Sequence, residues 1–137
     1  MDKVKSILIV DDDYVSAWIT KDAIDSLNLS AKVHMAYDGV EALTFLEKHC
    51  LTSTHPECSF CPAVIFLDLN LPVLDGFEFL EEFKSKYASI AHGINIYILT
   101  TSSYPKDLEK ADFFNVAGFV SKPLKEETIR DIFAKLS

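Results

Sequence analysis

The sequence predicts an α/β fold, a doubly wound parallel sheet with helices on both faces. Short apolar runs rich in β-branched and aromatic residues alternate with segments of helical spacing. Parallel neighbouring strands need crossover connections, and these are usually helices. We therefore expect five strands alternating with five helices. The expected strands are residues 6–10, 32–36, 63–67, 94–99 and 118–120.

Three of the helical segments carry a recognisable apolar stripe. The clearest is the last, where Ile129, Ile132, Phe133 and Leu136 recur at i, i+3, i+4 and i+7. Two further stripes are Phe77, Leu80, Lys84 and Tyr87 with Phe83 at the margin, and Val15, Ile19, Ala23 and Leu27. We expect each stripe to cover one face of the sheet.

Length and composition are those of one ordinary domain. The chain has 137 residues, of which 49% are hydrophobic and 12% aromatic, so we expect a single domain over residues 1–137 with a substantial core. Acidic residues outnumber basic ones by 21 to 13, and the net charge of -8 opposes unaided binding to nucleic acid or to an anionic membrane. The apolar run at residues 7–10 is too short for a signal peptide or a membrane span, and we expect a cytoplasmic protein.

The three cysteines, Cys50, Cys58 and Cys61, fall within one stretch of twelve residues. A secreted scaffold held by disulfides would spread an even number along the chain, so we expect reduced thiols. Together with His55 these residues form the pattern C-x4-H-x2-C-x2-C. A structural zinc site on these four residues is therefore an alternative, although the spacing is not that of a standard zinc finger.

Polar residues follow four of the expected strands. They are Asp11 and Asp12, Asp68, Thr100 and Thr101, and Ser121 and Lys122. Because parallel strands point the same way, residues at their carboxyl ends converge at one edge of the sheet, where open α/β sheets bind ligands. We expect these acids, a hydroxyl and an ammonium to share one cleft.

Clustered carboxylates suit a hard cation with oxygen ligands, and Mg²⁺ commonly needs only one or two of them. Asp12 and Asp68 are the first candidates as ligands. Lys122 and the metal would then balance the charge of a phosphoryl donor, and Thr100 would donate a hydrogen bond. A carboxylate can act as nucleophile and form an aspartyl-phosphate. Asp68, which ends the expected central strand, is the best candidate for that role.

The same residues resemble a known family. The segments VDDD, IFLDLNLPVLDGFEFL, YILTTS and GFVSKP are similar, in order and spacing, to the receiver domain of two-component response regulators, the CheY-like superfamily. The resemblance covers essentially the whole chain. It implies a flavodoxin-like sheet of five parallel strands in the order 2-1-3-4-5.

The resemblance also implies a role for each site residue. Asp68 would be the phospho-accepting aspartate, and Asp11 and Asp12 the acidic pair that holds Mg²⁺ or Mn²⁺, with the backbone carbonyl of Asn70 completing the metal shell. Thr100 would be the switch hydroxyl, Lys122 the partner of the phosphoryl group and Phe119 the aromatic switch. Asp13 lies just past the metal pair, and we assign it to capping the first helix.

The resemblance implies a signalling protein, and because no effector domain follows Ser137 we expect it to stand alone. A phosphohistidine on a sensor histidine kinase or a histidine phosphotransfer protein would be the donor. The chain would catalyse only its own phosphorylation and dephosphorylation. Reorientation of Thr100 and Phe119 would then change a surface that binds a downstream protein, unless the phosphoryl group is relayed onward.

Two other functions deserve comparison. A phosphatase of the haloacid dehalogenase type also forms an aspartyl-phosphate on an α/β sheet, but it needs a second carboxylate two residues after the nucleophile, where this chain has Asn70. A receiver-like protein that binds partners without being phosphorylated is the other possibility. The joint presence of Asp12, Asp68, Thr100 and Lys122 argues against it.

Overall fold

A computed structural model describes residues 6–27, 32–51, 61–69, 74–87, 94–100, 109, 116–122 and 124–136. The described strands are β1 (Ser6–Val10), β2 (Lys32–Ala36), β3 (Val64–Asp68), β4 (Asn95–Thr100) and β5 (Gly118–Ser121). The described helices are α1 (Tyr14–Asp25), α2 (Gly39–Leu46), the π-helical turn η1 (Glu47–Leu51), α3 (Gly76–Lys86) and α6 (Glu126–Leu136). The expected strands agree with these bounds to within one residue.

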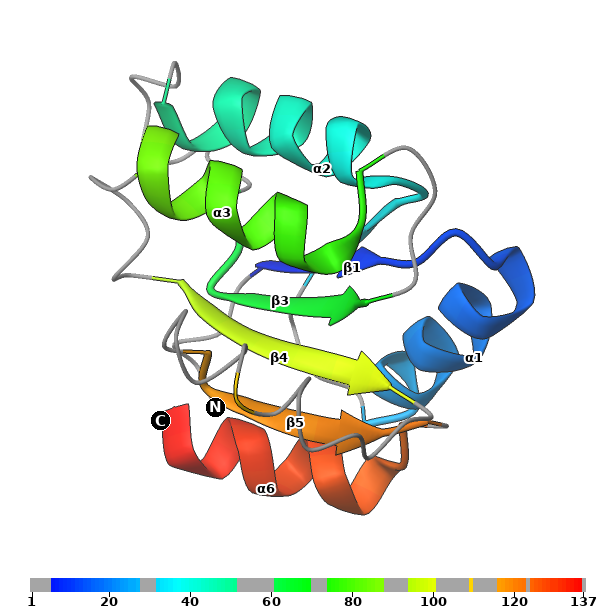
Figure 1. Ribbon diagram of the computed structural model, residues 1–137. Helices are drawn as coiled ribbons and strands as arrows, with labels where there is room; N and C mark the ends of the chain where they lie inside the picture. Colours follow the sequence, from blue (N-terminus) through cyan, green and yellow to red (C-terminus); the bar gives the residue numbers. More distant parts are fainter. Residues whose placement is uncertain are drawn as a thin grey trace.

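The five strands form one parallel sheet in the order β2-β1-β3-β4-β5. The fold is therefore that of CheY-like, flavodoxin-like proteins, as the resemblance implied. Strands β1, β3 and β4 lie inside the sheet and have a neighbour on each side, and every residue of β1 and β3 is buried. Their continuous apolar runs suit strands that are covered on both faces. The arrows of β1, β3, β4 and β5 point the same way in Figure 1, and β2 pairs in parallel with β1, so the carboxyl ends of the strands share one edge.

One face of the sheet is covered by α2 and α3, which lie side by side above it in Figure 1. Alternate strand residues point to this face, as the two-residue period of a strand requires. The buried cluster there includes Leu8, Val10, Ile65, Leu67, Ile96 and Ile98 from the strands, and Ala42, Leu46, Phe79, Leu80 and Phe83 from the helices. The stripe expected on α3 is partly wrong, because Phe79 and Phe83 are fully buried while Phe77 and Lys84 are only half-buried.

The opposite face is covered by α1 and α6. Here the cluster includes Ile7, Ile9, Val64, Phe66 and Leu99 from the strands, and Ala17, Ile24, Ile129, Ile132 and Phe133 from the helices. Burial of Ile129, Ile132 and Phe133 confirms the amphipathic pattern of the last helix for the residues whose side chains are described.

The stripe expected on α1 is partly wrong, because Ala23 and Leu27 pack against the cluster on this face but Val15 and Ile19 do not. Val15 is 68% exposed and Ile19 is 44% exposed, whereas Ala17, Thr20 and Ile24 are the buried residues of this helix. Polar bonds at the first turn agree with this rotation, since the Ser16 hydroxyl donates to Asp11, directly after β1, and the amide of Val15 donates to Asp13. Small Ala17 and the hydroxyl-bearing Thr20 therefore face the sheet, and apolar side chains are left on the outside.

Close packing between α3 and the end of β3 depends on a glycine. A Cβ atom on Gly76 would lie 2.7 Å from the Cα of Leu69 and 3.0 Å from the carbonyl oxygen of Asp68. The amide of Gly76 donates a hydrogen bond to the carbonyl of Leu69, at 3.1 Å. Asp75 caps the helix in a capping box with Glu78. The start of α3 is thus fixed directly against the strand that ends in Asp68.

Candidate functional site

The candidate site lies at the carboxyl edge of the sheet, where several strand ends meet. Asp11 follows β1, Asp68 is the last residue of β3, and Thr100 is the last residue of β4. Lys122 follows β5, and its amide donates to the carbonyl of Thr100 at 3.1 Å, so it continues the pairing of these two strands. The expected convergence of residues from distant parts of the chain is therefore confirmed for this edge.

Three carboxylates form the acidic part of the site. One oxygen each from Asp11, Asp12 and Asp68 lies within 4.8 Å of the other two. Asp11 is fully buried and Asp68 is 6% exposed, whereas Asp12 faces solvent. The cluster therefore opens toward solvent on the side of Asp12.

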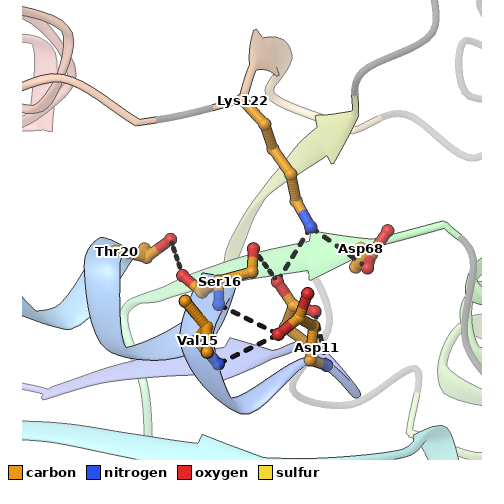
Figure 2. A network of polar contacts seen from close by, with 7 residues as sticks. Asp11, Val15, Ser16, Thr20, Asp68 and Lys122 are labelled. Atoms are coloured by element: carbon orange, nitrogen blue, oxygen red, sulfur yellow. Dashed lines mark hydrogen bonds and ion pairs between the residues drawn. The ribbon is translucent and has the colours of Figure 1, made fainter.

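Lys122 reaches into this cluster and contacts two of its acids (Figure 2). Its Nζ lies 2.8 Å from Oδ2 of Asp11 and 3.2 Å from Oδ2 of Asp68. The lysine side chain is mostly buried, with 17% of its surface exposed, so these contacts are better shielded from solvent than a surface ion pair would be. Lys122 thereby offsets part of the repulsion among the carboxylates.

The buried Asp11 receives hydrogen bonds on both oxygens. Its Oδ2 accepts from the Ser16 hydroxyl at 2.7 Å as well as from Lys122, and its Oδ1 accepts from the amide of Asp13 at 3.0 Å. Asp13 in turn caps α1 by accepting from the amides of Val15 and Ser16. The assignment of Asp13 to capping is confirmed. Figure 2 shows Ser16 pointing from the first turn of α1 toward Asp11.

The electrostatics of this network keep its members charged. Burial of the Asp11 carboxyl favours its neutral form, but the bonds from Lys122, Asp13 and Ser16 outweigh that effect and lower its pKa. Burial likewise disfavours the ammonium of Lys122. The hydrogen bond to Asp11 and the charge of Asp68 outweigh it, and the pKa of Lys122 is raised. Both groups are therefore ionised at neutral pH.

The donor set fits a hard divalent cation. It consists of carboxylate oxygens from three residues, with one member exposed to solvent, and Mg²⁺ is typically bound by one or two carboxylates while it keeps several waters. Asp11 has other partners on both oxygens, so Asp12 and Asp68 offer the more accessible ligand atoms. The backbone carbonyl of Asn70, predicted to complete the shell, lies outside the described residues, as does Thr101.

The remaining predicted residues lie nearby in the sheet. Thr100 is buried and lies one position beyond Leu99, which pairs with Asp68 in the register of β3 and β4. Phe119 pairs with Ile98 and is half-buried, and it packs against the cluster under α2 and α3. These positions agree with the expected arrangement, and their switch roles stay predictions.

Sequence reasoning missed Ser16. The available signal was weak: a serine in the first turn of the helix that follows the acidic stretch. Its hydroxyl is brought to the buried acid because Asp13 fixes where the helix begins. Ser16 therefore lies on the side of α1 that faces the end of β1.

The expectation of reduced thiols is wrong for two of the three cysteines. Cys50 and Cys61 form a disulfide, and their Cα atoms are 4.8 Å apart, within the range that such a bond spans. Sulfur atoms bonded to each other are not available as thiolate ligands, so the proposed zinc set of Cys50, His55, Cys58 and Cys61 is not formed. His55 and Cys58 themselves lie outside the described residues.

Comparison with known proteins agrees with this fold and site. The family model of the response regulator receiver domain matches residues 7–134. A probable methanogenesis regulatory protein of Methanothrix harundinacea, FilR2, is 30% identical over 90% of this chain and 76% of its own length.

Solved structures of response regulators are also similar to this chain. A two-component response regulator from Legionella pneumophila is 27% identical, with a TM-score of 0.80 over 96% of this chain and 97% of that one. The Mn²⁺-bound form of the response regulator Rcp1 is also 27% identical, with a TM-score of 0.72 over 96% of this chain and 88% of the other.

An open parallel sheet with an acidic cluster and a lysine at its carboxyl edge defines a CheY-like receiver. The chain belongs to the response regulator receiver domain family of two-component signalling. Within the described ranges, none of the helices combines the length and the apolar character that crossing a bilayer requires.

Proposed function

We propose that this chain accepts a phosphoryl group on Asp68 from a histidine kinase or a histidine phosphotransfer protein, in a reaction that requires Mg²⁺. The observation that carries the proposal is the position of Asp68. Its carboxylate ends the central strand β3, lies within 4.8 Å of the other two acids and contacts the ammonium of Lys122. Membership of the receiver family supports the same assignment.

In the proposed reaction an oxygen of Asp68 attacks the phosphorus of a phosphohistidine. The P–N bond breaks, the imidazole leaves and an aspartyl-phosphate remains. A bound Mg²⁺ would be held by Asp12 and Asp68, with Asp11 behind them, and would neutralise charge on the phosphoryl oxygens. Lys122 already contacts Asp68, so its ammonium can pair with the new phosphoryl group.

The consequence of phosphorylation would be a change in partner binding or onward transfer. Thr100 would turn toward the phosphoryl group and Phe119 would follow, which changes the surface around β5. We further propose that the chain acts by contact with a protein and not with nucleic acid. The net charge of -8 supports this, since phosphate backbones repel an acidic surface.

Incubation with acetyl phosphate and Mg²⁺ tests the assignment. Intact mass spectrometry should show one added phosphoryl group on the wild-type chain and none on Asp68→Asn. Asp131→Asn, an exposed aspartate on α6, is the matched control and should be labelled like the wild type. Chelation of the metal should abolish labelling of the wild type and of Asp131→Asn. Labelling of Asp68→Asn at the wild-type rate would contradict the proposal.

A further inference from the structure

The disulfide between Cys50 and Cys61 lies away from the acidic cluster and has no part in the proposed phosphorylation. Cys50 belongs to η1, the turn that ends the α2 segment, and Cys61 comes three residues before β3. The bond therefore ties the end of a helix to the beginning of the central strand. Asp68 is at the other end of that strand.

The fold holds the two bonded residues close together by other means as well. On the strand side, the amide of Ala63 donates to the carbonyl of Ser6, and the carbonyl of Ala63 accepts from the amide of Asn95, both at 2.9 Å. On the helix side, Ala42 and Leu46 of α2 are fully buried and hold that helix against the sheet. Neither anchor involves a sulfur atom, so we expect both to remain in the reduced chain and to keep the two thiols near each other.

Neither cysteine is fully buried. Each is half-buried and packs against the edge of the apolar cluster under α2 and α3. Thiol–disulfide exchange requires that a thiolate approach one sulfur of the bond, which full burial would prevent. The sequence also supplies a third cysteine, Cys58, between the bonded pair, and it serves as an internal reference.

We propose that Cys50 and Cys61 form a reversible thiol–disulfide site whose co-reactants are small thiols and disulfides of the glutathione class. In oxidation, the thiolate of one cysteine attacks a sulfur of the co-reactant disulfide and releases one thiolate. The second cysteine attacks the resulting mixed disulfide and releases the other. The protein gives up two electrons and two protons, and one S–S bond is lost in the co-reactant while another forms in the protein.

The expected effect is local to the connection between α2 and β3. Closing a loop with a sequence separation of 11 residues restricts the unfolded chain, so oxidation should raise the thermal midpoint by about 5 to 10 °C. Labelling of Asp68 by acetyl phosphate should be the same in both redox forms, because the bond lies at the opposite end of β3. This readout separates the inference from the proposed function.

The test equilibrates the whole chain with mixtures of reduced and oxidised glutathione, followed by acid quench, alkylation of free thiols and peptide mass mapping. In oxidising mixtures Cys50 and Cys61 should be recovered as one disulfide-linked peptide pair, with Cys58 alkylated or carrying glutathione. In reducing mixtures all three cysteines should be alkylated. Cys58→Ser is the matched control and should keep the full redox-dependent shift in midpoint. Cys50→Ser and Cys61→Ser should each lose it.

Three results would overturn the inference. One is a disulfide within the protein that joins Cys58 to Cys50 or Cys61 in the oxidised wild-type chain. Another is a pair that stays wholly oxidised, or wholly reduced, at every glutathione ratio. The third is stoichiometric zinc on the reduced chain by native mass spectrometry, since the thiols would then be metal ligands. Mapping is done on the wild-type chain, so the test stands even if a serine variant fails to fold.

Discussion

Asp11 is the residue around which the polar network is built. It is fully buried, yet it stays ionised because a lysine, a serine hydroxyl and a backbone amide all donate to it. A buried charge is tolerable only when it is paired and hydrogen-bonded in this way. The network also fixes where Lys122 lies, and hence which side of Asp68 carries the positive charge.

Replacement of Ser16 by alanine tests the weight of one donor in that network. The Ser16→Ala variant should lose about 1 to 2 kcal/mol of unfolding free energy, since a partly buried hydrogen bond to a charged group is removed. Urea denaturation measures the difference. Ser26→Ala, at the C-cap of the same helix, is the control, because its hydroxyl is exposed and bonds the exposed Glu126, and its change should stay below about 0.5 kcal/mol. Equal losses in the two variants would show that Asp11 does not depend on Ser16.

At the scale of elements, strands were easier to predict than helix faces. Each strand is a short stretch of mainly apolar residues between breakers, so its position could be predicted from the local sequence. The face of α1 could not, because its apolar residues Val15 and Ile19 point outward while Ala17 and Thr20 point inward. Periodicity measures how apolar residues are spaced and takes no account of polar bonds such as those that Asp13 and Ser16 make at the first turn of this helix.

The contact between α3 and β3 gives a second prediction. Gly76→Ala should destabilise the fold by about 1 to 3 kcal/mol, because the new methyl group would meet backbone atoms that cannot move aside. It should also slow labelling by acetyl phosphate, since the crowded atoms belong to Asp68 and its neighbour Leu69. Thermal melts and intact mass measure the two effects.

Gly118→Ala is the matched control for that substitution. Its added Cβ would lie 3.2 Å from a ring atom of Tyr97, a longer contact than the 2.7 Å at Gly76 and with a side chain in place of backbone, so the change should stay within about 1 kcal/mol. If Gly76→Ala is no less stable than Gly118→Ala, then the close approach of α3 to β3 is not a constraint on the fold.

At the scale of the whole molecule, one topological rule explains why the site was predictable. Parallel strands bring residues that are far apart in the chain to one edge, so the polar residues at the carboxyl ends of β1, β3, β4 and β5 had to meet. Contacts that depend on side-chain geometry did not follow from this rule. The bond from Ser16 to Asp11 and the disulfide between Cys50 and Cys61 are of that kind.

The acidic edge also sets a balance between stability and metal binding for the molecule as a whole. Three carboxylates within 4.8 Å of one another repel in a chain that already carries a net charge of -8, and Lys122 offsets only part of this. Without divalent metal, Asp12→Asn should therefore unfold at a higher temperature than the wild type, by an amount that corresponds to about 1 kcal/mol or less.

Added Mg²⁺ should reverse that order. A cation that binds only the folded state stabilises it by about 2.7 kcal/mol at a hundred times its dissociation constant, so the midpoint of the wild type should rise as Mg²⁺ is titrated. Asp12→Asn lacks one ligand, so its midpoint should rise only weakly with Mg²⁺. Plotted against the metal concentration, the midpoints of the two proteins should cross. Asp131→Asn removes the same charge from exposed α6 and should keep the full response. An undiminished Mg²⁺ response in Asp12→Asn would mean that the cation binds without this carboxylate, and the ligand set would have to be drawn from Asp11 and Asp68 alone.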